Sequence, residues 1–356
     1  MELPPDVETP APVVDLDRLR SNVQRMADRL TARGLALRPH AKTHKSPAVA
    51  RMQVEAGAVG LTVATLSEAE VFADAGFTDL LVAYPLVPTG AKAARLRRLL
   101  DGVDLLVGVD NPVGAAAIAE AARDRQVRVV LEVDSGQHRT GVLPADVVGL
   151  AERCRSLGLQ VSGVFTHGGH SYRDPSAPSG AAQDESRALA EAADRLAGAG
   201  FEPTIVSAGS TPTSGADRSA RVTEERPGTY VFNDRQQLAL GACTADQVAL
   251  TVAATVVSVG HGRFVVDAGS KALASDRPGW LDGHGWVPAL GDAVVTTLSE
   301  HHGVVEGAST LPGVGDVVAV VPNHVCTVVN LFDEYVVVRR GREVDRWPVA
   351  ARGRNV

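Results

Sequence analysis

The sequence has few cysteines and aromatic residues and no long apolar run. Its three cysteines, Cys154, Cys243 and Cys326, are an odd number at unrelated spacings among 356 residues, which excludes a disulfide framework and favours a reducing compartment. No stretch approaches the roughly 18 uninterrupted apolar residues of a membrane span, and the N-terminal residues lack a cationic segment followed by an apolar one. We therefore expect a cytoplasmic protein that makes no contact with the membrane.

An excess of positive charge is also missing. Lysine and arginine number 35 against 42 aspartates and glutamates, giving a net charge of -7. This balance provides no basic surface for nucleic acid or for an anionic membrane. The sequence also lacks the glycine-rich patterns of dinucleotide-binding folds and P-loops. With 45% hydrophobic residues, the composition is that of a globular protein with a large core.

What the sequence does contain, up to about residue 235, is a hydrophobic period that alternates between about two and about 3.6. The expected strands are residues 35–39, 60–64, 79–83, 104–109, 128–133, 160–165, 204–207 and 229–232. Between them lie amphipathic helical stretches at residues 67–75, 91–100, 113–125, 145–157 and 181–199. Eight strands with helical crossovers predict a closed (β/α)8 barrel of the TIM type, and a doubly wound parallel sheet is the alternative.

The pattern changes after about residue 239, where long amphipathic helices cease. Short β-branched runs, separated by glycine, proline and aspartate, occur at residues 248–252, 263–267, 293–297, 316–321 and 335–338. They predict an antiparallel β domain over residues 239–356 that follows a barrel over residues 18–238. The strand-like segment 11–16 precedes the barrel, and residues 1–17 can join either domain.

Polar residues gather where the predicted barrel strands end, which is where barrels carry their chemistry. After the first strand, Lys42 lies among His40, His44 and Lys45, and neighbouring positive charge favours the neutral amine that forms Schiff bases. A solvated basic loop is the alternative. After the seventh strand, the small-residue turn at residues 207–213 offers backbone N–H groups to a phosphate, or is an ordinary Ser/Gly/Pro turn.

The sequence resembles the D-serine dehydratase and D-threonine aldolase family over nearly its whole length. The resemblance rests on four segments in the expected order: residues 38–45 (RPHAKTHK), 132–142 (EVDSGQHRTGV), 207–213 (SAGSTPT) and 322–326 (PNHVC). It implies an alanine racemase-like barrel of fold-type III that binds pyridoxal 5'-phosphate, followed by a β domain that carries a divalent metal. It also implies a homodimer in which the β domain of one subunit meets the barrel mouth of the other.

The resemblance assigns roles to single residues. Lys42 matches the lysine that binds the cofactor covalently, and Arg139 matches the arginine that faces the pyridine ring. The phosphate-binding side matches Gly209, Ser210, Thr211 and Tyr230, and the stretch near the ring contains His167 and Tyr172.

A metal site is expected at His324 and Cys326. Two residues apart on an extended strand, their side chains would share one face. An imidazole and a thiolate suit Zn²⁺ and leave coordination positions open, whereas Mn²⁺ or Mg²⁺ goes with the His-x-Asp pair of other family members. A cysteine buried as a small apolar residue is the alternative. His301 or His302 in the same domain is expected to act as an acid–base group, although the pair can equally be surface residues.

The expected activity is dehydration of a D-3-hydroxy amino acid, such as D-serine, to a keto acid and ammonia. Cleavage by a D-threonine aldolase reaction to glycine and an aldehyde is the alternative, since the same residues serve both. An amino acid racemase is a more distant alternative, because it needs a second base and no metal. A cofactor carrier without activity would lack the β domain.

Overall fold

The computed structural model describes residues 1–356, and these divide into two compact units. One, called here the antiparallel unit, comprises Met1–Arg25, Thr43–Val49 and Thr229–Gly353. The other, the parallel unit, comprises Met26–Lys42, Ala50–Gly228 and Arg354–Val356. No helix in either unit has the length and apolar character that crossing a lipid bilayer requires.

An eight-stranded parallel sheet forms the centre of the parallel unit, in the order β2-β9-β8-β7-β6-β5-β4-β3. Its strands are β2 (Ala36–Leu37), β3 (Leu61–Val63), β4 (Asp79–Val82), β5 (Asp104–Val109), β6 (Arg128–Glu132), β7 (Gln160–Phe165), β8 (Ile205–Ala208) and β9 (Glu224–Glu225). Beyond the end of β2, His40 forms a parallel bridge with Thr62 of β3. The Ala41 amide donates to the carbonyl of Thr62 at 2.8 Å there, so the segment that follows β2 is hydrogen-bonded to β3.

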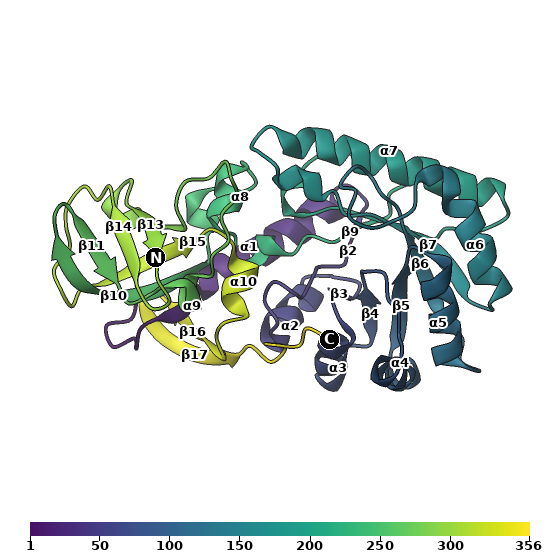
Figure 1. Ribbon diagram of the computed structural model, residues 1–356, viewed down its shortest axis with the longest axis horizontal. Coiled ribbons are helices and arrows are strands. Elements are labelled where there is room, and N and C mark those ends of the chain that lie inside the picture. Colours follow the sequence, from purple (N-terminus) through teal and green to yellow (C-terminus); the bar gives the residue numbers. More distant parts are fainter. The chain divides into compact units, whose positions relative to one another are not determined.

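Helices follow the strands, as the sequence predicts, and Figure 1 shows several of them along the outside of the sheet. They are α1 (Leu16–Thr31), α2 (Pro47–Glu55), α3 (Leu66–Asp74), α4 (Ala91–Gly102), α5 (Pro112–Ala122), α6 (Val147–Ser156) and α7 (Ala177–Gly198). Local capping sets their starts. Asn111 accepts a hydrogen bond from the Gly114 amide at 2.8 Å, and Pro112 at the first helical position has the fixed φ that starts α5.

Seven of the eight predicted barrel strands are confirmed and the eighth is wrong. Residues 229–232 form a 3-10 helix, η4 (Thr229–Val231), and the eighth strand is β9, two glutamates that pair with both β2 and β8. Two adjacent acidic residues lack the apolar pattern from which a buried strand is predicted. They are buried because arginines neutralise them: Arg38 bonds to Glu224 at 3.0 Å, and Arg218 bonds to Glu225 at 2.8 Å.

The antiparallel unit confirms the predicted change of architecture in the C-terminal third. Its nine-stranded sheet has the order β11-β14-β13-β12-β15-β10-β1-β16-β17. The strands are β1 (Ala11–Asp15), β10 (Leu250–Gly260), β11 (Arg263–Val266), β12 (Gly285–Trp286), β13 (Val294–Leu298), β14 (Gly303–Glu306), β15 (Val317–Pro322), β16 (Glu334–Arg339) and β17 (Arg342–Pro348). Short helices α8 (Arg235–Ala239), α9 (Ser270–Leu273) and α10 (Val325–Val329) connect them.

The N-terminal strand β1 belongs to this unit. It pairs antiparallel with β10 and parallel with β16, and the β1–β16 ladder is the one parallel ladder of the sheet. The core beside it is aliphatic and includes the fully buried Val252, Val256, Val266, Val295, Val305 and Val320, with Phe264. Burial of these side chains on one face explains the β-branched runs of the sequence.

Candidate active site

Lys42 is the exposed amine of its basic segment. It follows β2 and the His40–Thr62 bridge. The neighbouring basic groups are buried and used in structural contacts: Arg38 bonds to Glu224, and Lys45 Nζ donates to the carbonyl of Ala351 at 3.3 Å. The segment is therefore not a uniformly solvated basic loop, and Lys42 is the lysine in it that a ligand can reach.

Arg139 lies in a rigid loop after β6 with its guanidinium free. The loop is held by Asp134, whose carboxylate accepts from the Gly136 amide at 2.9 Å and from His138 Nδ1 at 2.7 Å. Arg139 itself is exposed and makes no hydrogen bond or ion pair within the chain. A fixed backbone that presents an unpaired guanidinium provides a site for an anion.

His167 is the second residue after β7 and lies among positive groups. It is half-buried, and its ring lies 6.4 Å from that of Tyr172, with 42° between the ring planes. Burial, and then the positive charges of Lys42 and Arg139, lower the pKa of His167 well below 6.5. The imidazole is therefore neutral at physiological pH.

The turn after β8 contains Gly209, Ser210 and Thr211. Gly209 has φ of +90°, and an added Cβ would lie 3.1 Å from that of Glu225, so this position requires glycine. The Ser210 amide donates to Thr213 Oγ1 at 2.9 Å. The turn is therefore stabilised internally. Tyr230, predicted for the same phosphate-binding side, is buried in η4 of the antiparallel unit.

His324 and Cys326, the predicted metal ligands, lie close together, but the prediction that they lie on an extended strand is wrong. His324 is the N-cap residue of α10, and Cys326 lies in the first turn of that helix. Burial alone lowers the pKa of His324, but the negative charges of Cys326 and Asp234 outweigh it and raise the pKa to about 9. His324 Nδ1 is buried without a hydrogen-bond partner, 3.7 Å from Asp234 Oδ2. Cys326 Sγ donates to Thr43 Oγ1 at 3.3 Å, and Thr43 follows Lys42 in the chain.

His301 and His302 are exposed in the turn between β13 and β14. No hydrogen bond or ion pair joins either imidazole to His324 or Cys326. Nor does any cluster of three or more histidine, cysteine, aspartate or glutamate side chains form a metal site. The donor set that the structure brings together is thus the pair His324 and Cys326.

Two residues beside these groups were not predicted from the sequence. Asp234 is fully buried, caps α8 by accepting from the Gln237 amide at 2.8 Å, and accepts from the Val325 amide at 3.0 Å. An aspartate before a helical stretch is an N-cap signal that could have identified it. Arg226 is buried, and no local pattern marks it, because its partners come from the ends of two other strands, β7 and β8.

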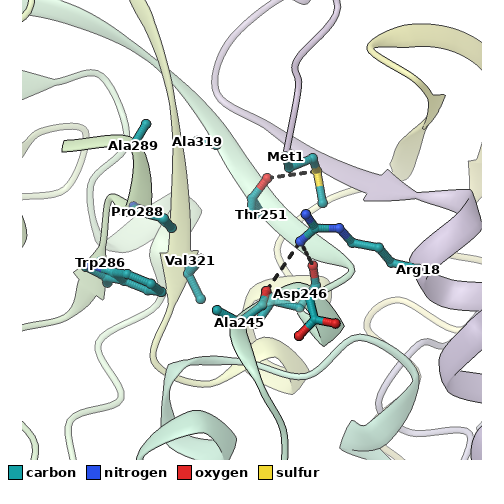
Figure 2. A pocket seen from close by; sticks show the side chains of 11 residues that line it. Met1, Arg18, Ala245, Asp246, Thr251, Trp286, Pro288, Ala289, Ala319 and Val321 are labelled. Carbon is teal, nitrogen blue, oxygen red and sulfur yellow. Dashed lines mark hydrogen bonds between the residues drawn. The ribbon is translucent and has the colours of Figure 1, made fainter. Parts of the chain in front are cut away.

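A separate pocket of about 290 Å³ lies in the antiparallel unit (Figure 2). Arg18 lies across one side, donating to the carbonyls of Ala245 at 3.3 Å and Val248 at 3.0 Å, and Trp286 and Pro288 lie opposite. None of the predicted site residues lines this pocket.

Comparison with known proteins places the chain among enzymes. Residues 14–236 match the N-terminal domain of alanine racemase, and residues 249–338 match the putative serine dehydratase domain. The chain is 39% identical to D-threo-3-hydroxyaspartate dehydratase of Delftia sp. (strain HT23), across 96% of this chain and 97% of the relative. The solved structure of that enzyme superposes with a TM-score of 0.89 at 37% identity, over 96% of this chain and 97% of that one. A cysteine-to-alanine variant of it, in the metal-free form, superposes equally well.

Two other relatives span both domains. D-threonine aldolase of Arthrobacter sp. is 33% identical over 98% of this chain and 93% of the relative. D-serine dehydratase of Dictyostelium discoideum is 28% identical over 95% of each. The chain therefore belongs to the D-serine dehydratase and D-threonine aldolase family of pyridoxal phosphate-dependent lyases with an alanine racemase-like fold.

Proposed function

We propose that the chain is a pyridoxal phosphate- and metal-dependent lyase that dehydrates D-3-hydroxy amino acids to a 2-oxo acid and ammonia. The observation that carries this choice is the near full-length likeness to a D-threo-3-hydroxyaspartate dehydratase. The cysteine of the metal pair supports it, since the family resemblance associates the His-x-Asp alternative with aldolases.

The residues of the parallel unit fit an anionic cofactor that bears an aldehyde. Lys42 offers an exposed amine, and Arg139 offers a guanidinium without a partner in the chain. We propose that the residues holding the cofactor are Lys42, Arg139, His167, Tyr172, Gly209, Ser210, Thr211 and, from the antiparallel unit, Tyr230. When bound, pyridoxal phosphate supplies a conjugated ring that stabilises negative charge at the substrate Cα.

Lys42, Arg139 and His167 have different proposed roles in the reaction. Lys42 would hold the cofactor through its amine, and the same amine, when free, would accept the proton from the substrate Cα. Arg139 donates hydrogen bonds but does not release a proton, so it orients the cofactor without protonating it. His167 stays neutral among its cationic neighbours, and therefore adds contact without adding charge.

The antiparallel unit fits a metal ion. The buried, unpartnered Nδ1 of His324 and the thiol of Cys326 form a nitrogen and sulfur donor set, which suits Zn²⁺ better than Mn²⁺ or Mg²⁺. We propose that these two residues hold Zn²⁺, which supplies Lewis acidity toward the β-hydroxyl of the substrate. The acid–base role of His301 or His302 stays a prediction.

Aldol cleavage to glycine and an aldehyde is the second candidate, supported by the 33% identity to D-threonine aldolase over 98% of the chain. The two reactions differ in the proton removed first, which is that of Cα in dehydration and that of the β-hydroxyl in cleavage. A racemase is less well supported, because it needs a second base for Cα and has no use for the pair His324 and Cys326.

Four further proposals concern architecture and setting. We propose that the parallel sheet is a closed TIM-type barrel, which the His40–Thr62 bridge supports. We place the domain boundary between residues 238 and 239, between the two family matches that end at residue 236 and begin at residue 249. We propose a homodimer from the family resemblance. A cytoplasmic location is supported by three free cysteines.

A product assay tests the proposed function. The enzyme is incubated with D-threo-3-hydroxyaspartate, D-serine and D-threonine, with and without a chelator, while keto acid and ammonia are followed separately from glycine and aldehyde. We expect chelator-sensitive release of ammonia. Chelator-sensitive release of glycine without ammonia would establish the aldolase instead, and no turnover of any of the three would contradict both.

A further inference from the structure

Arg226 is a buried cation without an ion pair. It is 5% exposed, directly follows β9, and its amide donates to the carbonyl of Ala208 at the end of β8 at 2.9 Å. No carboxylate lies within ion-pair distance of its guanidinium, and an arginine keeps its proton even where burial disfavours the charge. Because enclosing an unpaired charge is destabilising, a role beyond packing is needed to explain this residue.

The guanidinium joins the ends of two neighbouring strands. Nη2 donates to the carbonyl of Thr166, which follows β7, and Nη1 donates to Ser207 Oγ in β8. Its Cζ lies 5.3 Å from the centre of the Phe165 ring. Ser207 Oγ in turn donates to Glu224 Oε1 at 2.5 Å, so the nearest counter-charge is reached through a hydroxyl group.

These contacts fix the backbone on one side of His167. Thr166 precedes it, and on the other side the Gly168 amide donates to Glu185 Oε1 at 2.9 Å. Thr166 Oγ1 also donates to the carbonyl of Val133 at 2.6 Å, which ties the same point to the end of β6. The peptide groups flanking the imidazole are therefore anchored by two buried charged residues on different elements.

Charge acts on the same imidazole. The positive groups that face His167 are Lys42 after β2, Arg139 after β6, Arg226 after β9 and His170 in the loop after β7, while Glu185 on α7 is the carboxylate beside Gly168. Arg139 is exposed, so water screens its charge, whereas Arg226 is enclosed and its field is much less screened.

We infer that Arg226 is a positioning residue: it ties the ends of β7 and β8 together and so fixes the position of His167 and of the Gly209–Thr211 turn. The inference rests on the proposed function, which assigns His167 and that turn to the cofactor. Arg226 acts through Thr166 and Ser207 and needs no contact of its own with the substrate.

The test compares R226M, R226Q and R226K with the wild-type full-length chain. The titration of His167 is followed by NMR of histidine-labelled protein, with the H167N spectrum assigning the signal, and pyridoxal phosphate affinity is measured by absorbance titration. We expect the midpoint of His167 to lie below 6.5 in the wild type and to rise by about one pH unit in R226M and R226Q. We expect R226K to restore the wild-type midpoint to within a few tenths of a unit. Cofactor affinity should fall at least about tenfold in R226M, with partial recovery in R226K.

Two control variants separate positioning from loss of stability. S207A removes one acceptor of Arg226 but keeps its charge, so we expect it to leave the titration of His167 unchanged. Leu96→Ala removes a fully buried side chain of α4 that takes no part in the network, and reports what destabilisation alone does to the titration and to cofactor affinity.

The outcomes are distinct. The inference is overturned if His167 of the wild type titrates at or above 6.5, or if its midpoint is the same in R226M, R226Q and the wild type. It is also overturned if Leu96→Ala changes the His167 midpoint and the cofactor affinity as much as R226M does. If the wild type binds no pyridoxal phosphate, the proposed function fails instead, whatever the titration of His167 shows.

Discussion

The two units of the chain bury polar groups in different ways. The parallel unit encloses a network of opposite charges at the ends of its strands: Arg218 bonds to Glu185 at 2.9 Å and to Glu225 at 2.8 Å, and its side chain is 2% exposed. The antiparallel unit has a valine-rich core, and its polar groups of interest, the buried Asp234 and the half-buried His324 and Cys326, lie together around α8 and α10.

Sheet type explains this difference. Strands of a parallel sheet that is covered on both sides have no solvated face, so charged residues at their ends are enclosed and must neutralise one another. Strands of the antiparallel sheet alternate, and most of their polar side chains point to water. In the parallel unit, therefore, an unpaired cation such as Arg226 or Arg139 indicates a functional role, whereas in the antiparallel unit the half-buried donor pair His324 and Cys326 does so.

The largest expected effect comes from removing the reactive group of the parallel unit without disturbing its charge network. Lys42→Ala should lower kcat/KM at least about 10⁴-fold, because both the covalent link and the base are lost. The absorbance of bound cofactor, and its loss on borohydride treatment, should disappear with it. Lys92→Ala, which removes a half-buried lysine from α4, is the matched control and should leave both readouts intact; if it behaves like Lys42→Ala, the assignment is wrong.

The second largest effect is expected from breaking the buried charge network of the parallel unit. Arg218→Met leaves Glu185 without an ion-pair partner and Glu225 with Arg33 alone, at 3.6 Å, and should lower the free energy of unfolding by about 3–5 kcal/mol. Val305→Ala in the antiparallel core removes two buried methyl groups and should cost about 2 kcal/mol. Urea unfolding measures the free energy of unfolding of both variants. A smaller decrease for Arg218→Met than for Val305→Ala would contradict the stated difference between the two units.

The donor pair of the antiparallel unit is tested by Cys326→Ala. Zinc affinity, measured by competition with a chelator, should fall at least about a hundredfold because one of two protein ligands is gone. Cys243→Ala is the matched control, since burial raises the pKa of the Cys243 thiol to about 12 and keeps it protonated. Equal zinc content in Cys326→Ala and wild type would refute the site.

The smallest effect is a pH dependence in the parallel unit. Burial and neighbouring cations lower the pKa of His167 below its unfolded value of 6.5, so its neutral form contributes stability above pH 6.5, and that stability is lost as the pH falls toward the folded pKa. Between pH 7.5 and 5.5 the loss should be about 1 kcal/mol and should be absent in His167→Gln. Urea midpoints at the two pH values measure it, and identical pH dependence in wild type and variant would show that His167 is not the group responsible.

The sequence was sufficient to predict most of the elements but not the buried charges. Aliphatic strands such as β5 and β7 matched their predicted limits because local hydrophobic period decides them. Strand β9 was missed because its glutamates are compatible with burial only through arginines distant in the chain, Arg38 lying 186 positions from Glu224. The same reason explains why Arg226 was missed.

For the candidate site, residue types were more predictable than geometry. The spacing of His324 and Cys326 fits a strand, and the β-branched residues around Cys326 favour one, yet Asp234 accepts a hydrogen bond from the Val325 amide and the segment turns into α10. That contact joins residues 91 positions apart, which local sequence cannot reveal.

The place of β1 has a consequence for the order in which the chain folds. Val13 pairs with Thr251 on one side and with Val336 on the other, so both ladder partners are synthesised long after it. At about 5–20 residues per second, the ribosome takes roughly 12–50 s to reach β10 after β1 has been made. Throughout that time an apolar strand with two open edges must be kept from pairing elsewhere, and the ladders of β1 can be completed only after β16 has left the ribosome.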